Sequence, residues 1–141
     1  MPAIEFTTEI DARPDVVWGH LTAFDRYEEW NPFTPSVSTD GRLGDSVTLR
    51  AVLSERLPPR RTDLVITRLD PPHALCWGAE SRALRVERCQ TLTDLGDGRT
   101  RYRSHETFEG LAGLVVVALT GRWLRRGYAA AAAGLKQVAE S

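Results

Sequence analysis

The sequence predicts an α+β fold, in which a curved antiparallel sheet of about six or seven strands wraps around one long C-terminal helix. Two observations support this prediction. Residues 47–108 read almost throughout as strand. Residues 111–140 follow a helical pattern, in which apolar or small residues recur every three or four positions. That stripe comprises Leu114, Val117, Gly121, Leu124, Tyr128, Ala131, Leu135 and Val138.

The predicted helix must bury this stripe against the concave face of the sheet. Some of its residues are too small to fill the space that a leucine would fill. Gly121, Ala131 and Gly134 are the small residues on this side of the helix. We therefore expect a cavity between the helix and the sheet.

The N-terminal part of the chain predicts one strand and two short helices. Residues 3–10 alternate between apolar and polar side chains, which is typical of a strand. Pro14 suits the first turn of a short helix over residues 14–23. A second short helix at 26–30 ends before Pro32, because the residue before a proline avoids helical backbone angles. The two helices are expected to close one end of the sheet.

The middle of the chain divides into strands separated by turn residues. Residues 33–45 predict a loop or a weak strand. Strands are predicted at 46–55, 61–69, 74–79, 84–95 and 99–109. In the first of these, one face carries Val47, Leu49, Ala51 and Leu53. The segment Gly96-Asp97-Gly98 is a strong hairpin signal, which as a three-residue loop would pair Leu95 with Arg99.

Composition narrows the classes of function. The 141 residues fit a single domain, 1–141. A net charge of −1 argues against nucleic-acid binding, which needs a basic face. The apolar run at 111–121 is far shorter than the ~20 residues that span a bilayer, and the N-terminus lacks a signal-peptide pattern. We expect no stable membrane insertion, a cytoplasmic location, and either a monomer or a homodimer.

Motifs for metal, nucleotide or hydrolytic chemistry are absent from the sequence. It contains no HExxH, GxSxG, Walker or GxGxxG pattern, so we expect no metal and no cofactor. Cys76 and Cys89 also lack the partners of a zinc site. If Trp77 and Arg88 are cross-strand neighbours, the two cysteines are neighbours too, on the opposite face. Free thiols are expected, and a disulfide is the alternative.

One face of the hairpin formed by the last two strands carries a band of polar residues. The register sets Leu92 opposite Tyr102, Gln90 opposite Ser104, Arg88 opposite Glu106 and Val86 opposite Phe108. If this face points inward, Arg88 and Glu106 form an ion pair, because burying either charge alone is costly. The pair either orients a polar group of a ligand or serves only the structure.

A register slip of one residue is the alternative. It would place Cys89, Thr91, Arg103 and His105 inside instead. The ordinary pKa of histidine suits proton transfer. In the favoured register, however, His105 faces away from the cavity.

Aromatic and small residues complete the predicted site. Trp30 and Phe33 are expected at the mouth of the pocket, where the second short helix meets a loop. The predicted ligand-binding residues are Phe6, Trp30, Phe33, Leu49, Ile66, Trp77, Arg88, Gln90, Tyr102, Ser104, Glu106, Phe108, Val117, Gly121, Leu124 and Tyr128. Glu106, Arg88 and Tyr102 are the candidate catalytic residues.

Several segments, in this order, resemble the START-related helix-grip superfamily, also named SRPBCC or polyketide cyclase/dehydrase. The matching segments are Pro14…Val17-Trp18, Phe24-Asp25…Trp30-Asn31-Pro32-Phe33, Asp70-Pro71-Pro72…Trp77, Gly98…His105-Glu106…Phe108 and Leu135-Lys136…Ala139-Glu140. The resemblance implies a helix-grip fold with a deep apolar cavity. It also implies a carrier of lipids, sterols, hormones or polyketides, or an aromatase, cyclase or hydrolase, but no shared catalytic motif.

Three hypotheses follow for the function. The leading one is binding of a small hydrophobic molecule that carries a polar handle, with a lipid-, polyketide- or aromatic-like character. The alternative is an enzyme of the polyketide cyclase/aromatase type, in which Glu106, Tyr102 or Arg88 assists enolisation or dehydration. The third is a chaperone-like or stress-related interaction module with a filled core.

Overall fold

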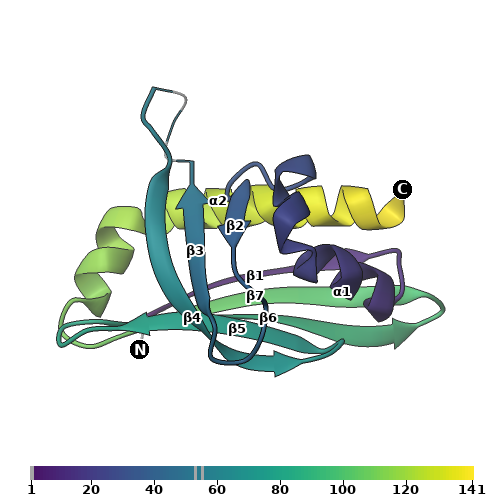
Figure 1. Ribbon diagram of the computed structural model, residues 1–141, viewed down its shortest axis with the longest axis horizontal. Helices are drawn as coiled ribbons and strands as arrows, with labels where there is room; N and C mark the ends of the chain where they lie inside the picture. Colours follow the sequence, from purple (N-terminus) through teal and green to yellow (C-terminus); the bar gives the residue numbers. More distant parts are fainter. Residues whose placement is uncertain (1, 53, 55) are drawn as a thin grey trace.

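The computed structural model describes residues 2–52, 54 and 56–141. Seven strands form one antiparallel sheet in the order β1-β7-β6-β5-β4-β3-β2, and the long helix α2 (Gly113–Glu140) packs over β1 and β7 (Figure 1). The strands are β1 (Ala3–Ile10), β2 (Ser36–Ser38), β3 (Ser46–Ala51), β4 (Arg60–Asp70), β5 (Ala74–Glu80), β6 (Arg85–Gly96) and β7 (Arg99–Glu109). The predicted α+β helix-grip architecture is confirmed.

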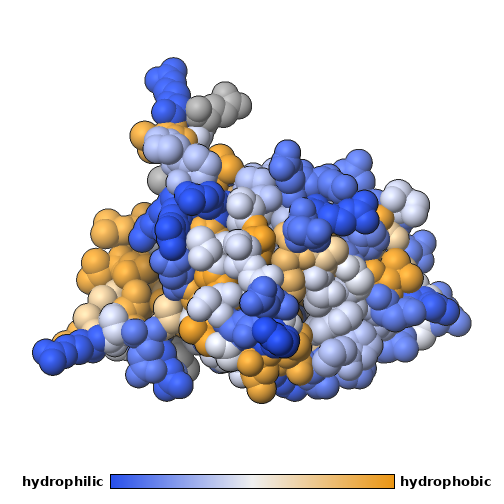
Figure 2. Space-filling view, in the orientation of Figure 1, coloured by the Kyte–Doolittle hydropathy of each residue, from blue (hydrophilic) through white to orange (hydrophobic). Residues whose placement is uncertain are grey.

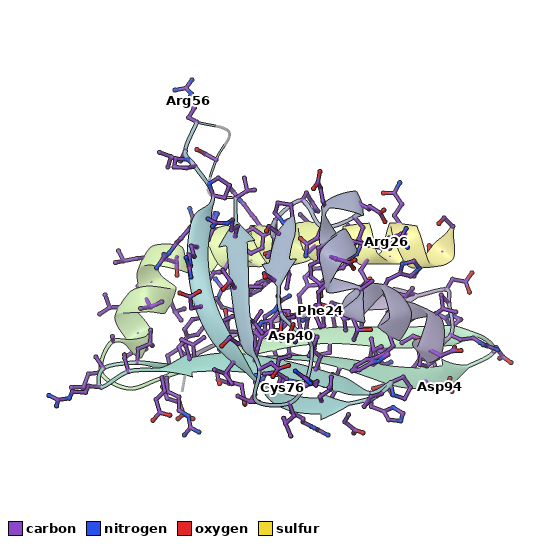
Figure 3. The ribbon with its side chains drawn as sticks, in the orientation of Figure 1. Phe24, Arg26, Asp40, Arg56, Cys76 and Asp94 are labelled. Carbon is purple, nitrogen blue, oxygen red and sulfur yellow. A yellow bond between two sulfur atoms is a disulfide. The ribbon has the colours of Figure 1, made fainter. Side chains whose placement is uncertain are left out.

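The two predicted short helices follow β1. They are α1 (Pro14–Thr22), with Pro14 in its first turn, and the 3-10 helix η1 (Phe24–Glu29). The buried Tyr27 hydroxyl donates a hydrogen bond of 2.5 Å to the Leu21 carbonyl and so ties η1 to α1. Phe24 reaches from the start of η1 toward the sheet (Figure 3), where its ring centroid lies 6.4 Å from that of Trp77.

The strand boundaries differ from the prediction mainly in the first half of the sheet. The weak strand expected within 33–45 is the short β2, which pairs with β3. The strand expected at 46–55 is β3, whose last residue is Ala51, and Leu53 lies outside the described residues. β1 pairs with β7, which sets Ile4 opposite Glu106. The first strand therefore lies beside the last one, under the long helix.

The β6–β7 hairpin has a tighter turn than predicted. Gly96, not Leu95, pairs with Arg99, and the register shifts at Leu95. Asp97 and Gly98 both have positive φ angles, 54° and 73°, as a two-residue turn of this twist requires. The expected pairing of Leu95 with Arg99 was wrong, but the extra residue at the bulge restores the predicted facing of the rest of the hairpin.

Cys76 and Cys89 form a disulfide, so the expectation of free thiols was wrong. The predicted register is confirmed, because the two residues are directly opposed on β5 and β6 with their Cα atoms 4.1 Å apart. This register brings the two sulfur atoms within bonding distance. The cytoplasmic location, on which the free-thiol expectation rested, stays a prediction.

The first turns of α2 extend beyond the sheet, and the predicted burial of Leu114 was wrong. Leu114 is 73% exposed, because α2 meets the sheet further along, near Val116 and Val117. Figure 2 shows the resulting apolar surface at the left, over the first turns of α2. Within the described residues, no helix is long and apolar enough to cross a membrane.

Candidate ligand-binding site between the sheet and the C-terminal helix

Two apolar clusters lie between the sheet and the helices. The major cluster is built around Tyr27, Trp30, Ile66, Trp77, Tyr102 and Leu135, with Phe6 and Leu49 packed against it. The minor cluster contains Ile4, Phe33, Phe108, Tyr128 and Ala131, with Val86, Val117 and Leu124 packed against it. Every predicted apolar contact residue except Gly121 therefore falls in one of the two clusters.

A band of four polar side chains separates the clusters along β6 and β7. Arg88 and Gln90 on β6 are paired with Glu106 and Ser104 on β7, in the predicted register. All four are buried. Val86 and Phe108 lie on the side of the minor cluster, and Leu92 and Tyr102 on the side of the major cluster.

The pairing of β6 with β7 excludes the alternative register, in which the hairpin would be shifted by one residue. Cys89 is opposed to His105 and Thr91 to Arg103, on the outer face of the hairpin. Arg103 lies 2.8 Å from Glu5 in an exposed ion pair there. His105 therefore points away from the buried band, as the favoured register predicted.

Arg88 is held by neighbouring side chains on the same sheet and on the helix. Its Nε donates a hydrogen bond of 2.9 Å to Ser104 Oγ, and Nη2 lies 3.5 Å from the Tyr102 hydroxyl. The Tyr102 hydroxyl in turn donates to Gln90 Oε1 at 2.6 Å. The guanidinium carbon lies 3.9 Å from the centre of the Tyr128 ring, in a cation–π contact.

Glu106 is hydrogen-bonded to the helix rather than to Arg88. The Tyr128 hydroxyl donates to Glu106 Oε1 at 2.6 Å. Burial raises the pKa of the Glu106 carboxyl, and the Tyr128 hydrogen bond and the positive charge of Arg88 oppose this rise. Burial likewise raises the pKa of the Tyr128 hydroxyl well above its ordinary value, so the phenol acts as a donor.

The expected direct ion pair between Arg88 and Glu106 does not form among the described side chains. The two residues are opposed in the sheet, but Tyr128 contacts both of them, with its ring on Arg88 and its hydroxyl on Glu106. Because Tyr128 comes from α2, strand pairing alone could not predict its position between the two charges.

The small residues of α2 differ in what faces them. A Cβ at Gly134 would overlap the backbone carbonyl oxygen of Trp30, so this glycine allows a close approach of two chain segments and the expected cavity there was wrong. Gly121 is buried, and a Cβ there would lie nearest to its own helix, 3.2 Å from the Arg125 guanidinium and 3.5 Å from Val117. Leu124, near Gly121, is only half-buried. No atom of the sheet comes as close as 3.9 Å to a Cβ at Gly121, so α2 is packed less tightly against the sheet here than at Gly134.

Sequence reasoning missed two buried residues of this region. Ile4 lies opposite Glu106 on the neighbouring strand, and the alternation that predicted Phe6 could have found it. The Tyr27 ring packs against the Trp30 ring at a tilt of 54°, with ring centroids 4.6 Å apart. It lies in the six-residue 3-10 helix η1, which is too short for a periodic pattern to show its buried side. Tyr27 belongs to the segment that resembles the helix-grip superfamily, and this resemblance was its only signal in the sequence.

A separate hollow of about 680 Å³ lies between η1 and α2. Glu28, Glu29, Pro32, Ala130, Ala133 and Gln137 are among its lining residues, and Trp30 is its only predicted site residue. The Trp30 Nε1 group is enclosed and, in the part of the chain that the structure describes, has no hydrogen-bond acceptor. This hollow is distinct from the buried polar band.

The raised pKa of Glu106 predicts a stability that falls with pH. A carboxyl whose pKa is higher in the folded than in the unfolded state stabilises the fold below its ordinary pKa of 4.5. That contribution is lost as the pH rises through the folded-state pKa. The unfolding free energy of the wild type should therefore fall relative to that of Glu106→Gln as the pH is raised from about 4.5.

Urea unfolding of both proteins over a pH series measures this difference. Glu109→Gln, an exposed change on the same strand, is the matched control. A constant difference between the wild type and Glu106→Gln across the series would contradict the prediction.

The comparisons with known proteins agree with this architecture. Residues 1–140 match the model of the family described as polyketide cyclase / dehydrase and lipid transport. No match is found among curated proteins.

Solved structures with the same fold share little sequence with this chain. The Zhui aromatase/cyclase from Streptomyces sp. R1128 is 17% identical with a TM-score of 0.73, and the match covers 99% of this chain and 93% of that one. Norcoclaurine synthase from Thalictrum flavum, in complex with dopamine and hydroxybenzaldehyde, is 14% identical with a TM-score of 0.70, covering 97% and 85%.

A third similar structure is larger than this chain. The di-domain aromatase/cyclase BexL of the BE-7585A biosynthetic pathway is 15% identical with a TM-score of 0.75. The match covers 97% of this chain but 46% of BexL. At these identities the structures show a shared fold, while the family model matches nearly every residue. The chain therefore belongs to the polyketide cyclase/dehydrase and lipid transport family.

Proposed function

We propose that this protein binds a small apolar molecule with a polar handle, next to Gly121 and against the minor cluster. The handle would interact with Arg88 and Glu106. One observation carries the proposal: two charged side chains are buried here without being paired to each other. Buried charges that lack full protein pairing are expensive, and such groups are typical of ligand sites.

Both charged groups retain hydrogen-bonding capacity. A guanidinium has five N–H donors, of which Arg88 uses two on Ser104 and Tyr102. Among the described residues, Glu106 accepts a side-chain hydrogen bond at Oε1 alone, from Tyr128. A ligand carbonyl, enol or acid could accept from Arg88, and a hydroxyl could donate to the second oxygen of Glu106.

The wall around these groups suits an apolar body. Phe108 and Val86 flank the polar band on the side of the minor cluster, and Leu124 faces it from α2. Leu124 and Val86 are half-buried, which supports access from solvent at this end. The family description, which joins cyclases with lipid transport, also supports a hydrophobic ligand.

The alternative function, a cyclase or aromatase, is favoured by the carboxyl of Glu106. Its raised pKa makes it a better proton donor and acceptor near neutral pH than an ordinary glutamate. In this reading Glu106 would transfer the proton during enolisation or dehydration, and Arg88 and Tyr102 would polarise the carbonyl group.

The binding test uses an anionic apolar dye, anilinonaphthalene sulfonate, titrated against the wild type and Gly121→Leu. A leucine side chain at Gly121 would displace the flexible Arg125 side chain and add bulk next to the minor cluster. We expect dye affinity to fall about tenfold or more while the unfolding midpoint is retained. Leu119→Ser is the control, because exposed Leu119 could bind the dye on the outer surface. Dye binding that survives Gly121→Leu but is lost in Leu119→Ser would overturn the proposal.

The enzyme alternative needs a second measurement. If the protein is a cyclase, Glu106→Gln should abolish turnover of a poly-carbonyl test substrate while dye affinity changes little. If the protein only binds, the wild type shows no turnover of that substrate. Absence of any saturable dye binding would instead favour the interaction module with a filled core.

A further inference from the structure

We propose that the first turns of α2 dock the protein on an anionic lipid surface. This inference concerns the outer surface of the molecule and does not depend on the proposed ligand site. Four large apolar side chains at the start of α2 are exposed within nine residues of each other. Leu111 is 94% exposed, Leu114 73%, Val115 56% and Leu119 80%. Exposed apolar groups that cluster in this way mark interaction surfaces, whereas single ones need no explanation.

These four residues form one continuous surface, which we call the apolar tip. Val115 and Leu119 are four residues apart in α2 and so point to the same outward side, with Leu114 at its edge. Leu111 lies in the turn just before the helix. Figure 2 shows the corresponding apolar area at the left of the molecule, where α2 projects past β3 and β4 in Figure 1. The opposite side of these turns carries Val116 and Val117, which pack against the minor cluster.

Arginines border the apolar tip on two sides. Arg122, Arg125 and Arg126 occupy the next turns of α2, and all three are exposed. Arg122 and Arg126 lie on the same outward side of α2 as Val115 and Leu119, whereas Arg125 lies further round the helix, toward Gly121. No acidic residue occurs in α2 before Glu140.

The turn between β5 and β6 brings two more arginines to the tip. The backbone N–H of Ala112 donates a hydrogen bond of 2.9 Å to the carbonyl of Ala83, which fixes this turn against the start of α2. The exposed Arg82 and Arg85 flank Ala83 in sequence. The exposed acidic residues nearest this turn are Glu80 at the end of β5, Glu87 on β6 and Glu109 at the end of β7. Five arginines against three glutamates give this end of the molecule a positive charge.

Charge decides which partner the tip fits. An apolar helix face bordered by arginines inserts at the boundary between lipid headgroups and acyl chains, and its arginines are attracted to anionic headgroups. A second copy of this chain is a poorer partner. In a two-fold dimer through the tip, the arginines of one copy would face those of the other, which is repulsive. The helix would lie at the membrane surface and would not span the bilayer, in agreement with the short apolar run.

The test is sedimentation of the full chain with phosphatidylcholine vesicles that contain either no phosphatidylserine or about one third of it. We expect binding to the anionic vesicles and much weaker binding to the neutral ones. Added salt should weaken binding, because it screens the arginines. Leu114→Ser with Leu119→Ser should reduce affinity about tenfold or more, because two apolar side chains lose their burial. Leu43→Ser is the matched control, since Leu43 is 64% exposed on a loop elsewhere.

Replacing Arg122, Arg125 and Arg126 together by glutamine separates charge from apolar contact. This variant should lose most of its preference for anionic vesicles, with Arg82 and Arg85 left in place. The variants change exposed side chains only, and circular dichroism verifies their folding. Equal sedimentation of the wild type and the double leucine variant would overturn the proposal. A second result would also overturn the proposal. In it, the wild type binds neither kind of vesicle and forms a dimer, detected by light scattering, that Leu119→Ser dissociates.

Discussion

Gly134→Ala should destabilise the protein by roughly 3 kcal/mol. A methyl group at this position would overlap the backbone carbonyl oxygen of Trp30, and the Cδ of Pro32 lies 3.6 Å from the same point. A backbone carbonyl cannot rotate away as a side chain can. The segment that follows η1 would therefore have to move off α2, with Trp30 and the major cluster attached to it.

Gly19→Ala is the matched control for this prediction. Gly19 also lies within a helix, but nothing stands within 4 Å of a Cβ there. Alanine should therefore stabilise the protein by about 0.5–1 kcal/mol, through the ordinary preference of helices for alanine over glycine. Thermal or urea unfolding of the two variants measures both effects. Equal effects of the two substitutions would contradict the close approach of Trp30 to Gly134.

Arg88→Met should destabilise the protein by about 3 kcal/mol at pH 8 and by much less near pH 4.5. At the higher pH the substitution leaves the ionised Glu106 buried without the positive charge that compensates it. Near pH 4.5 Glu106 is half protonated in the unfolded chain and more than half protonated in the folded one, because burial raises its pKa. Losing the guanidinium then leaves much less uncompensated charge. The destabilisation grows with pH because the pKa of the buried Glu106 is raised, and it rises further once the positive charge of Arg88 is removed.

A double-mutant cycle with Glu106→Gln isolates the coupling between the two residues. In the Glu106→Gln background, Arg88→Met should cost much less at pH 8 than it does in the wild type. Arg103→Met is the control, because Arg103 pairs with Glu5 on the exposed outer face of the same sheet. Arg88→Met could instead lower the unfolding free energy by the same amount at both pH values and in both backgrounds. That result would show that Arg88 does not compensate the charge of Glu106.

Local periodicity was sufficient to predict the buried band of this protein. In a strand, successive side chains alternate between faces, so one hairpin register determines the direction of Arg88, Gln90, Ser104 and Glu106 together. The bulge at Leu95 shows how this prediction could have failed. One extra residue in the turn would have reversed every side chain, had the bulge not restored the alternation.

The contacts of the band were not predictable in the same way. Tyr128 is 22 residues from Glu106 in sequence, and its place between Glu106 and Arg88 depends on how far α2 is rotated and shifted along the sheet. Periodicity identifies the face of a helix but not its position along its axis. The same shift exposes Leu114 and places Gly134 against Trp30.

The sequence by itself determined the order of elements, the α+β class, the inward face of the β6–β7 hairpin and the side of α2 that meets the sheet. All of these depend on residues close in the chain, where strand and helix periods act directly. Only the tertiary structure decided that Tyr128 stands between two buried charges, that Cys76 and Cys89 are bonded, and that the first turns of α2 lie outside the core. These features depend on where separately formed elements come to rest against one another, which is set by packing over the whole molecule.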